Sequence, residues 1–218
     1  MRIGFRKLEG RHIRQIAALL ILALPFALTM QCAYSASKTV LVLGDSISAE
    51  HGLARGTGWV ALLKARLEAE KIDAVIINAS IGGDTTSGGL SRLPPLLRQH
   101  PSVVLIELGG NDGLRGLPLS ATEANLRSMI AAAQKAKAKV LLVGMQLPPN
   151  YGPDYTMKFA ALYGKLAKET KSALVPFLMA GMEDKPQLFQ ADRIHPAAKA
   201  QPLILNNVWP ALKPLLTK

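Results

Sequence analysis

The chain contains 218 residues, enough for one domain of ordinary size and too few for two full ones. Apolar residues make up 49% of it and charged residues 19%, a balance that allows a sizeable core and excludes an intrinsically disordered chain. The formal net charge is +11, but aromatic residues make up only 5% and no cluster of basic and aromatic side chains is present, so we expect no nucleic-acid partner.

The first 35 residues follow the order of a secretory signal peptide. A basic start leads into an apolar run over residues 16–30, and Ala33-Tyr34-Ser35 then offers small residues at the positions that precede a cleavage site. The apolar run is 15 residues long, shorter than the ~20 that a membrane-spanning helix needs. We therefore expect cleavage after Ser35 and export to the periplasm or the medium, with residues 36–218 as the mature domain.

Cys32 allows a different interpretation, a lipoprotein anchor. Lipidated cysteines usually follow a small residue, whereas Gln31 precedes Cys32, so we favour cleavage that leaves a domain without cysteine. Cleavage would also remove five basic side chains and one glutamate, which leaves a net charge of +7 on residues 36–218. The lysines are scattered from Lys38 to Lys218, which indicates a solvated surface. Transient contact with an anionic membrane surface is the alternative.

Short apolar strands alternate with amphipathic helices over the rest of the chain. The predicted strands are 39–43, 74–78, 102–108, 139–144 and 173–177. The predicted helices are 59–71, a segment after Thr85 that Pro94-Pro95 should interrupt, 121–138, 155–171, and 196 to about 215. Because continuous apolar strands between helices are typical of a parallel sheet covered on both faces, we expect a three-layer α/β/α domain with five parallel strands.

Polar and glycine-rich segments follow the carboxyl ends of the predicted strands, where ligands bind in open parallel sheets. The first strand leads into Gly44-Asp45-Ser46, the second into Gly82-Gly83-Asp84, and the third into Gly109-Gly110-Asn111-Asp112. Asp192-Arg193-Ile194-His195 follows near the carboxyl terminus. We expect these four segments to converge on one edge of the sheet.

Together the segments supply the groups that acyl transfer needs. A serine hydroxyl is a poor nucleophile until a base removes its proton, and His195 is the candidate base for Ser46. Asp192, three residues before His195, is close enough to orient the imidazole and stabilise the imidazolium. Backbone N–H groups at Ser46 and Gly83 and the side-chain amide of Asn111 are candidate donors to the oxyanion. Any one of these motifs alone has a structural explanation as a turn or a helix cap, and the prediction rests on their combination.

These motifs resemble those of the SGNH, or GDSL-type, hydrolases, and in particular the bacterial periplasmic thioesterases and lysophospholipases. The similar runs are GDSIS, NASIGGDTT, LGGNDGLRG, QLPPNYGPDY and DRIHP. The resemblance implies a flavodoxin-like fold, catalysis by Ser46, Asp192 and His195, and oxyanion donors from Ser46, Gly83 and Asn111. It also implies hydrolysis of aryl esters, acyl thioesters and lysophospholipids without a cofactor.

Two other functions compete with this interpretation. A carbohydrate O-acetyl esterase on the same fold would need aromatic and polar walls, whereas Leu114, Leu117 and Pro148 offer an apolar surface that suits an acyl chain. A non-catalytic lipid- or glycan-binding protein would not require the complete set of catalytic residue types. We therefore expect an enzyme that acts on a small-molecule or lipid acyl ester. We also expect it to be a monomer.

Several motifs of other functional classes are absent from the sequence. It contains no G-x-S-x-G, which argues against the α/β-hydrolase fold. It contains no H-E-x-x-H or cysteine–histidine cluster, and no G-x-G-x-x-G or P-loop, so we expect neither a metal nor a nucleotide cofactor. His51, five residues after Ser46, is interpreted as a solvated loop residue.

Overall fold

The structure, a computed structural model, describes residues 37–217. The predicted signal peptide, its cleavage site after Ser35, and Cys32 all lie outside the described residues. No helix within the described part of the chain is both long enough and apolar enough to cross a membrane.

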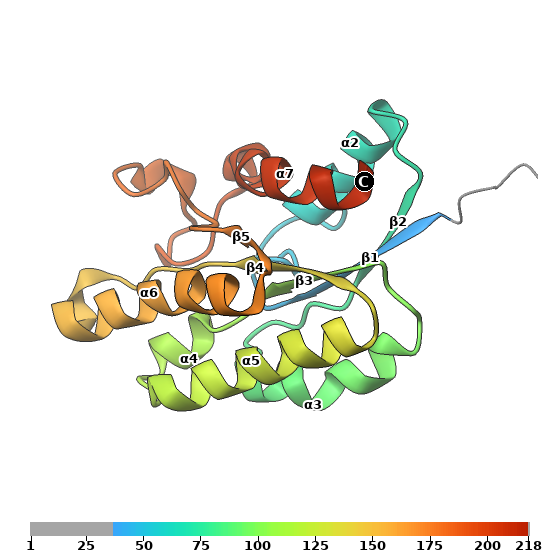
Figure 1. Ribbon diagram of the computed structural model, residues 1–218. Helices are drawn as coiled ribbons and strands as arrows, with labels where there is room; N and C mark the ends of the chain where they lie inside the picture. The colour runs from blue at the N-terminus through green and yellow to red at the C-terminus, as the bar shows by residue number, and fades with distance from the viewer. Residues whose placement is uncertain (1–36, 218) are drawn as a thin grey trace, which may run out of the picture. The chain divides into compact units, whose positions relative to one another are not determined.

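Five strands form one sheet at the centre of the fold (Figure 1). They are β1 (Lys38–Gly44), β2 (Ala74–Asn78), β3 (Val103–Glu107), β4 (Lys139–Val143) and β5 (Ala173–Val175). Every neighbouring pair is parallel and the order is β2-β1-β3-β4-β5. This is the doubly wound order of flavodoxin-like folds, and it confirms the predicted parallel sheet.

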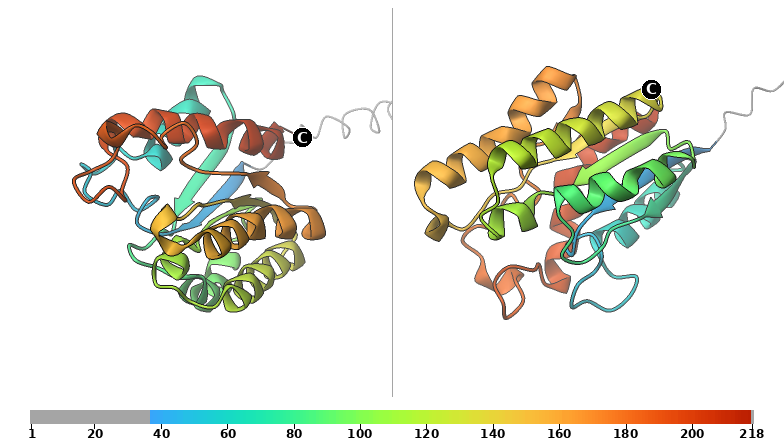
Figure 2. Two further views of the ribbon diagram at one scale, coloured as in Figure 1. Left: turned by 90° about the vertical axis from the view of Figure 1, so that its left-hand side faces the viewer. Right: turned by 90° about the horizontal axis from the view of Figure 1, so that it is seen from below.

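Helices cover both faces of the sheet, which confirms the predicted three layers (Figures 1 and 2). One face carries α2 (Trp59–Ala69) and α7 (Gln201–Thr217), and the other carries α3 (Thr86–Leu97), α5 (Leu119–Lys135) and α6 (Pro153–Thr170). Shorter elements are α4 (Gly110–Leu114) and the 3₁₀ turns η1 (Pro149–Tyr151), η2 (Pro186–Leu188) and η3 (Ala198–Ala200). The short helix α4 was not predicted from the sequence.

Burial explains why the strands are apolar throughout. All five residues of β3 are buried, because this central strand has a neighbour on each side and helices on both faces. The edge strand β2 is less enclosed, and Val75 is 56% exposed.

The prediction that Pro94 and Pro95 interrupt the helix after Thr85 was wrong, since α3 runs without a break from Thr86 to Leu97. Both prolines lie close to its carboxyl end, so the missing N–H groups weaken only the end of the helix. Leu93, just before them, is 1% exposed, and its packing favours continuation of the helix through this point. Tertiary packing here outweighs the local preference.

The sheet order places a switch point at the carboxyl end of β1. This strand lies between β2 and β3, and it is followed by α2 on one face, whereas β3 is followed by α4 and α5 on the other side of the sheet. Ligands of open α/β sheets bind where connections change face in this way.

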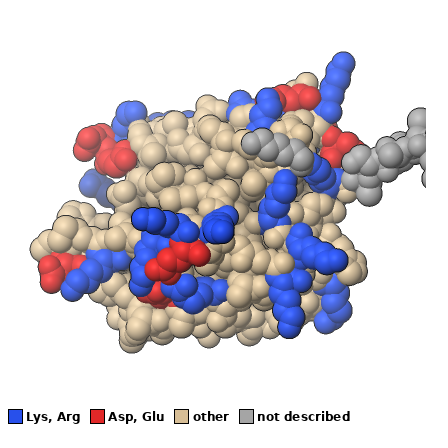
Figure 3. All heavy atoms as spheres, in the orientation of Figure 1, with Lys and Arg blue, Asp and Glu red and all other residues tan. Residues whose placement is uncertain are grey.

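Basic side chains are spread over the face drawn in Figure 3, with acidic side chains among those at its left. Ion pairs join some side chains of opposite charge on the surface: the Arg127 guanidinium lies 2.9 Å from Glu123 and 2.6 Å from Glu169. On this face the basic side chains are spread out and do not form one patch.

Candidate active site

Ser46 lies in the turn that directly follows β1. The turn is tight because Gly44 has no side chain: a Cβ at this position would lie 2.7 Å from Glu107 Oε2 and 2.8 Å from Ser80 Oγ. The N–H of Asp45 and the hydroxyl of Ser48, on either side of Ser46, are both bonded to the carboxyl group of Glu107. Ser46 itself remains partly exposed, so its hydroxyl is held by a rigid turn at the protein surface.

A chain of two hydrogen bonds links Ser46 to His195 and Asp192. His195 Nε2 lies 3.0 Å from Ser46 Oγ, and His195 Nδ1 lies 2.6 Å from Asp192 Oδ2. Ser46 and His195 are 149 residues apart in sequence, and the fold brings them within hydrogen-bond distance. The arrangement matches the geometry required for a base that is oriented by a carboxylate and activates a hydroxyl.

The loop that carries Asp192 and His195 is held by the aspartate itself. Asp192 Oδ1 accepts hydrogen bonds from the backbone N–H groups of Ile194 (2.9 Å) and His195 (3.0 Å). The backbone N–H of His195, then its ring, and then the N–H of Ile194 lower the pKa of Asp192 to about 2. The carboxylate is therefore ionised at neutral pH and can stabilise an imidazolium on His195.

Gly83 and Asn111 lie close to the turn that carries Ser46. Gly83 adopts a left-handed conformation with φ 75°, which a glycine takes without strain, and its carbonyl accepts a hydrogen bond from Arg115 (2.9 Å). Among residues 37–217, neither the Ser46 N–H nor the Gly83 N–H has a protein acceptor. Both are therefore available to a ligand.

The side-chain amide of Asn111 is differently situated. Its Nδ2 donates to Asp45 Oδ2 (3.1 Å) and to the carbonyl of Asp84 (2.9 Å). Asn111 thus joins the segments that follow β1 and β2. Because both N–H bonds of this amide already have acceptors, donation to an oxyanion would require one of them to be shared or exchanged.

Beneath Ser46 lie two buried acids that sequence reasoning did not single out as a pair. Asp45 and Glu107 are each 2% exposed. Burial is the main cause that raises the pKa of Asp45 to about 6, and burial together with the nearby Asp45 carboxyl raises the pKa of Glu107 well above its ordinary value. A glutamate at the end of an otherwise apolar strand was the one sequence signal for this position.

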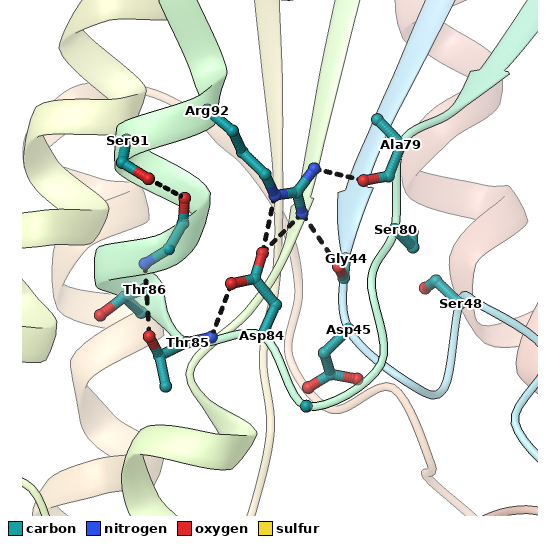
Figure 4. A network of polar contacts seen from close by, with 12 residues as sticks. Gly44, Asp45, Ser48, Ala79, Ser80, Asp84, Thr85, Thr86, Ser91 and Arg92 are labelled. Atoms are coloured by element: carbon teal, nitrogen blue, oxygen red, sulfur yellow. Dashed lines mark hydrogen bonds and ion pairs between the residues drawn. The ribbon is translucent and has the colours of Figure 1, made fainter.

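Arg92 is another residue that the sequence did not reveal (Figure 4). Its side chain extends from α3, and Nε donates to Asp84 Oδ2 at 2.7 Å. The same guanidinium donates to the backbone carbonyls of Ala79 and of Gly44, the latter at 3.3 Å. One cation therefore fixes the segment that contains Gly83 to the end of the strand that precedes Ser46.

The histidine at position 51 also lies beside the cluster. Its ring centroid is 4.2 Å from that of His195, with the ring planes inclined by 35°. The side chain is exposed, as predicted for a loop residue, but it contacts the candidate base.

The predicted apolar residues occupy two neighbouring segments. The Tyr151 hydroxyl donates to the carbonyl of Leu114 (2.9 Å), and the Tyr155 hydroxyl donates to the carbonyl of Leu117 (2.8 Å). Pro148 lies directly before η1, in the segment that contains Tyr151. These contacts hold the end of α4 against the start of α6, while Leu117 remains 37% exposed.

A surface hollow of about 330 Å³ lies elsewhere on the molecule. Its lining includes Lys38, Ser102 and Lys139, which lie at or just before the amino ends of β1, β3 and β4. None of the candidate active-site residues lines this hollow, and Ser46 follows the carboxyl end of β1, at the opposite edge of the sheet.

The chain is similar to known proteins of one hydrolase family. A profile of the GDSL-like Lipase/Acylhydrolase family matches residues 42–201. Esterase TesA of Pseudomonas aeruginosa is 53% identical over 198 residues, which cover 90% of this chain and 98% of that protein. Thioesterase 1/protease 1/lysophospholipase L1 of Escherichia coli K12 is 45% identical over 183 residues, covering 84% of this chain and 86% of that protein.

A solved structure is also similar. The psychrotrophic esterase EstA from Pseudoalteromonas sp., inhibited by monoethylphosphonate, aligns with a TM-score of 0.79 and 43% identity. The alignment covers 83% of this chain and all of that one.

Proposed function

The chain belongs to the GDSL-like lipase/acylhydrolase family and is an esterase of that family, and we propose that it hydrolyses acyl esters and thioesters through an acyl-enzyme on Ser46. The observation that carries the proposal is the hydrogen-bonded chain from Ser46 through His195 to Asp192, with separations of 3.0 Å and 2.6 Å.

His195 acts as a base and then as an acid. Its Nε2 removes the proton of the Ser46 hydroxyl while Oγ attacks the carbonyl carbon, and the same proton passes to the departing alkoxide or thiolate. A water molecule then gives a proton to His195 while its oxygen attacks the acyl carbon, and His195 returns that proton to Ser46 Oγ as the bond to the acyl group breaks and the acid leaves. Asp192 keeps Nδ1 protonated throughout and stabilises the imidazolium that forms twice per turnover.

The oxyanion is stabilised by groups that meet at the switch point. The N–H groups of Ser46 and Gly83 are free of protein acceptors within residues 37–217, and they are two of the donors. The amide of Asn111 is the third, provided that one of its present hydrogen bonds is exchanged as charge develops. Arg92 holds the Gly83 segment in the required place relative to Ser46.

The substrates that we propose are aryl esters, acyl thioesters and lysophospholipids. The Escherichia coli relative is named as a thioesterase and lysophospholipase, which supports this range. Leu114, Leu117 and Pro148 provide apolar surface for the acyl chain, and this contact favours medium or long chains over acetyl groups.

The same proposal includes export and a monomeric mature domain over residues 36–218. The basic, apolar and small-residue order of residues 1–35 supports a cleaved signal peptide and a periplasmic or secreted location.

A hydrolysis panel with a covalent probe tests the function. The wild-type protein should hydrolyse octanoyl esters and thioesters faster than acetyl esters, and an alkyl phosphonate should inactivate it by modifying Ser46. Ser46→Ala should be neither active nor labelled in the intact-mass spectrum. Labelling that persists in Ser46→Ala would contradict the proposed nucleophile, and a preference for acetylated sugars would contradict the acyl-chain site.

A further inference from the structure

The imidazole of His51 lies against that of His195 with its ring nitrogens uncommitted. The two ring centroids are 4.2 Å apart, and within residues 37–217 the His51 ring makes no hydrogen bond or ion pair. An exposed imidazole with both nitrogens available is a potential metal ligand.

The backbones that carry the two histidines are tied together. The Gln190 side-chain amide donates to the carbonyl of His51 (2.7 Å), and the Gln190 backbone N–H donates to the carbonyl of His195 (2.8 Å). The N–H of His51 donates to the carbonyl of Ser46 (3.1 Å). Three hydrogen bonds therefore hold the backbone of His51 close to the segments that carry Ser46 and His195.

Asp192 completes a set of three potential ligands. One ligand atom from each of His51, Asp192 and His195 lies within 4.8 Å of the other two. In a tetrahedral zinc site, with bonds of about 2.0–2.2 Å, ligand atoms are roughly 3.3 Å apart. Rotation of the exposed His51 side chain can bring its nitrogen closer to the other two ligand atoms, because no bond to the described part of the chain restrains this ring.

We propose that His51, Asp192 and His195 bind a divalent transition-metal ion, with Zn²⁺ as the best match, and that this ion reversibly inhibits the esterase. Two imidazoles and a carboxylate are ligands that suit Zn²⁺ and Cu²⁺, whereas Mg²⁺ and Ca²⁺ prefer oxygen ligands alone. The ion is an inhibitor and takes no part in hydrolysis.

Inhibition follows from where the ion must sit. A metal on Nε2 of His195 would occupy the lone pair that faces Ser46, and a metal on Nδ1 would replace the hydrogen bond to Asp192. Either mode removes the base that the reaction needs. This step rests on the proposed function, whereas binding of the ion does not.

The first experiment measures ester hydrolysis by the purified protein in a buffer that does not bind metals, with increasing ZnCl₂. Zinc should inhibit the wild type, EDTA should restore activity, and MgCl₂ should have no effect. His51→Phe keeps an aromatic ring against His195 but removes both nitrogens, so its half-inhibitory zinc concentration should rise about tenfold or more while metal-free activity is retained. His100→Asn, which removes an exposed histidine from the hollow at the amino ends of the strands, should remain as sensitive as the wild type. Equal sensitivity of the wild type and His51→Phe would overturn the inference.

The second experiment separates binding from catalysis. Calorimetric titration of Ser46→Ala with ZnCl₂ should show one site, which should be lost in the Ser46→Ala/His51→Phe double variant. No His51-dependent binding would refute the metal site and leave the proposed function standing. Binding that depends on His51, without any loss of hydrolysis in the wild type, would support the metal site but overturn the proposed inhibition.

Discussion

The backbone N–H of Asp45 donates a hydrogen bond to the buried carboxyl group of Glu107, with 3.2 Å between nitrogen and Oε2. The same Oε2 accepts the Ser48 hydroxyl at 2.7 Å, so one carboxyl group holds both sides of the turn that presents Ser46. The pKa of Glu107 is raised well above its ordinary value, chiefly by burial and then by the Asp45 carboxyl. The pKa of Asp45 is raised to about 6, again chiefly by burial.

These shifts predict a pH-dependent loss of stability. Both carboxyl groups bind protons more tightly in the folded than in the unfolded protein. Their contribution to the free energy of unfolding is therefore complete below about pH 4. It is lost as the pH rises through the folded values, which for Asp45 means through about 6. Glu107→Gln mimics the neutral acid and removes part of this dependence, so its free energy of unfolding should fall less than that of the wild type between pH 4 and pH 8.

Urea unfolding across that pH range measures the difference. Glu68→Gln, at an exposed position on α2, controls for the loss of one carboxyl group. Parallel pH profiles for the wild type and Glu107→Gln would show that the Glu107 carboxyl is not the source of the effect.

Ser46, His195 and Asp192 should behave as one unit. Ser46→Ala, His195→Ala and the double variant should each lose activity by a similar factor, roughly 10⁴–10⁶-fold, because removal of either partner already abolishes activation of the hydroxyl. Asp192→Asn should lose less, since the imidazole remains in place. The rate constants for hydrolysis of one aryl ester decide this: losses that multiply in the double variant would mean that Ser46 and His195 act independently.

Arg92 should affect turnover only by positioning the segment that contains Gly83 relative to Ser46. Arg92→Lys keeps a positive charge beside Asp84 but cannot hold the carbonyls of Gly44 and Ala79 at the same time. The Gly83 segment would shift relative to Ser46, and kcat should fall by about tenfold or more with a smaller change in KM. Arg98→Gln, which alters an exposed arginine at the end of the same helix, is the matched control. A lower melting temperature with an unchanged kcat would assign Arg92 a purely structural role.

The parts of the fold that sequence could predict are those that local pattern determines. Apolar runs located all five strands, and the glycine-rich segments located the carboxyl edge where Ser46, Asp192 and His195 meet. Their roles in catalysis stay predictions, although the geometry suits them.

What local pattern could not provide are contacts between distant elements. Arg92 reaches a carbonyl 48 residues away, and the Glu107 carboxyl accepts a hydrogen bond from a residue 62 positions earlier. Nor could local pattern show that the ring of His51 would lie against the ring of His195, near the other end of the chain. The continuity of α3 through Pro94 and Pro95 likewise depends on burial of its neighbour Leu93, which only the packed structure reveals.

The last prediction concerns Asn111, for which two roles compete. The sequence allowed a role as a helix cap, but the residue before α4 is Gly109 and Asn111 lies inside the helix. Its amide instead connects Asp45 Oδ2 with the carbonyl of Asp84. The structural alternative to oxyanion donation is therefore a tether between the segments after β1 and β2.

The variant Asn111→Ala separates the two roles. Loss of a tether alone would lower the free energy of unfolding by about 1–3 kcal/mol, because the carboxyl of Asp45 and the carbonyl of Asp84 would each lose a donor, and the folded fraction would turn over almost normally. If the amide also donates to the oxyanion, the contact strengthens as negative charge develops, so kcat should fall by roughly 10²–10³-fold with little change in KM. We expect the second outcome, because the amide bonds to Asp45 and Asp84, which directly adjoin Ser46 and Gly83 in sequence, and the N–H groups of those two residues have no protein acceptor within residues 37–217. Chemical unfolding and steady-state kinetics on the same preparation decide between them, and a destabilised variant with normal kcat would remove Asn111 from the oxyanion site.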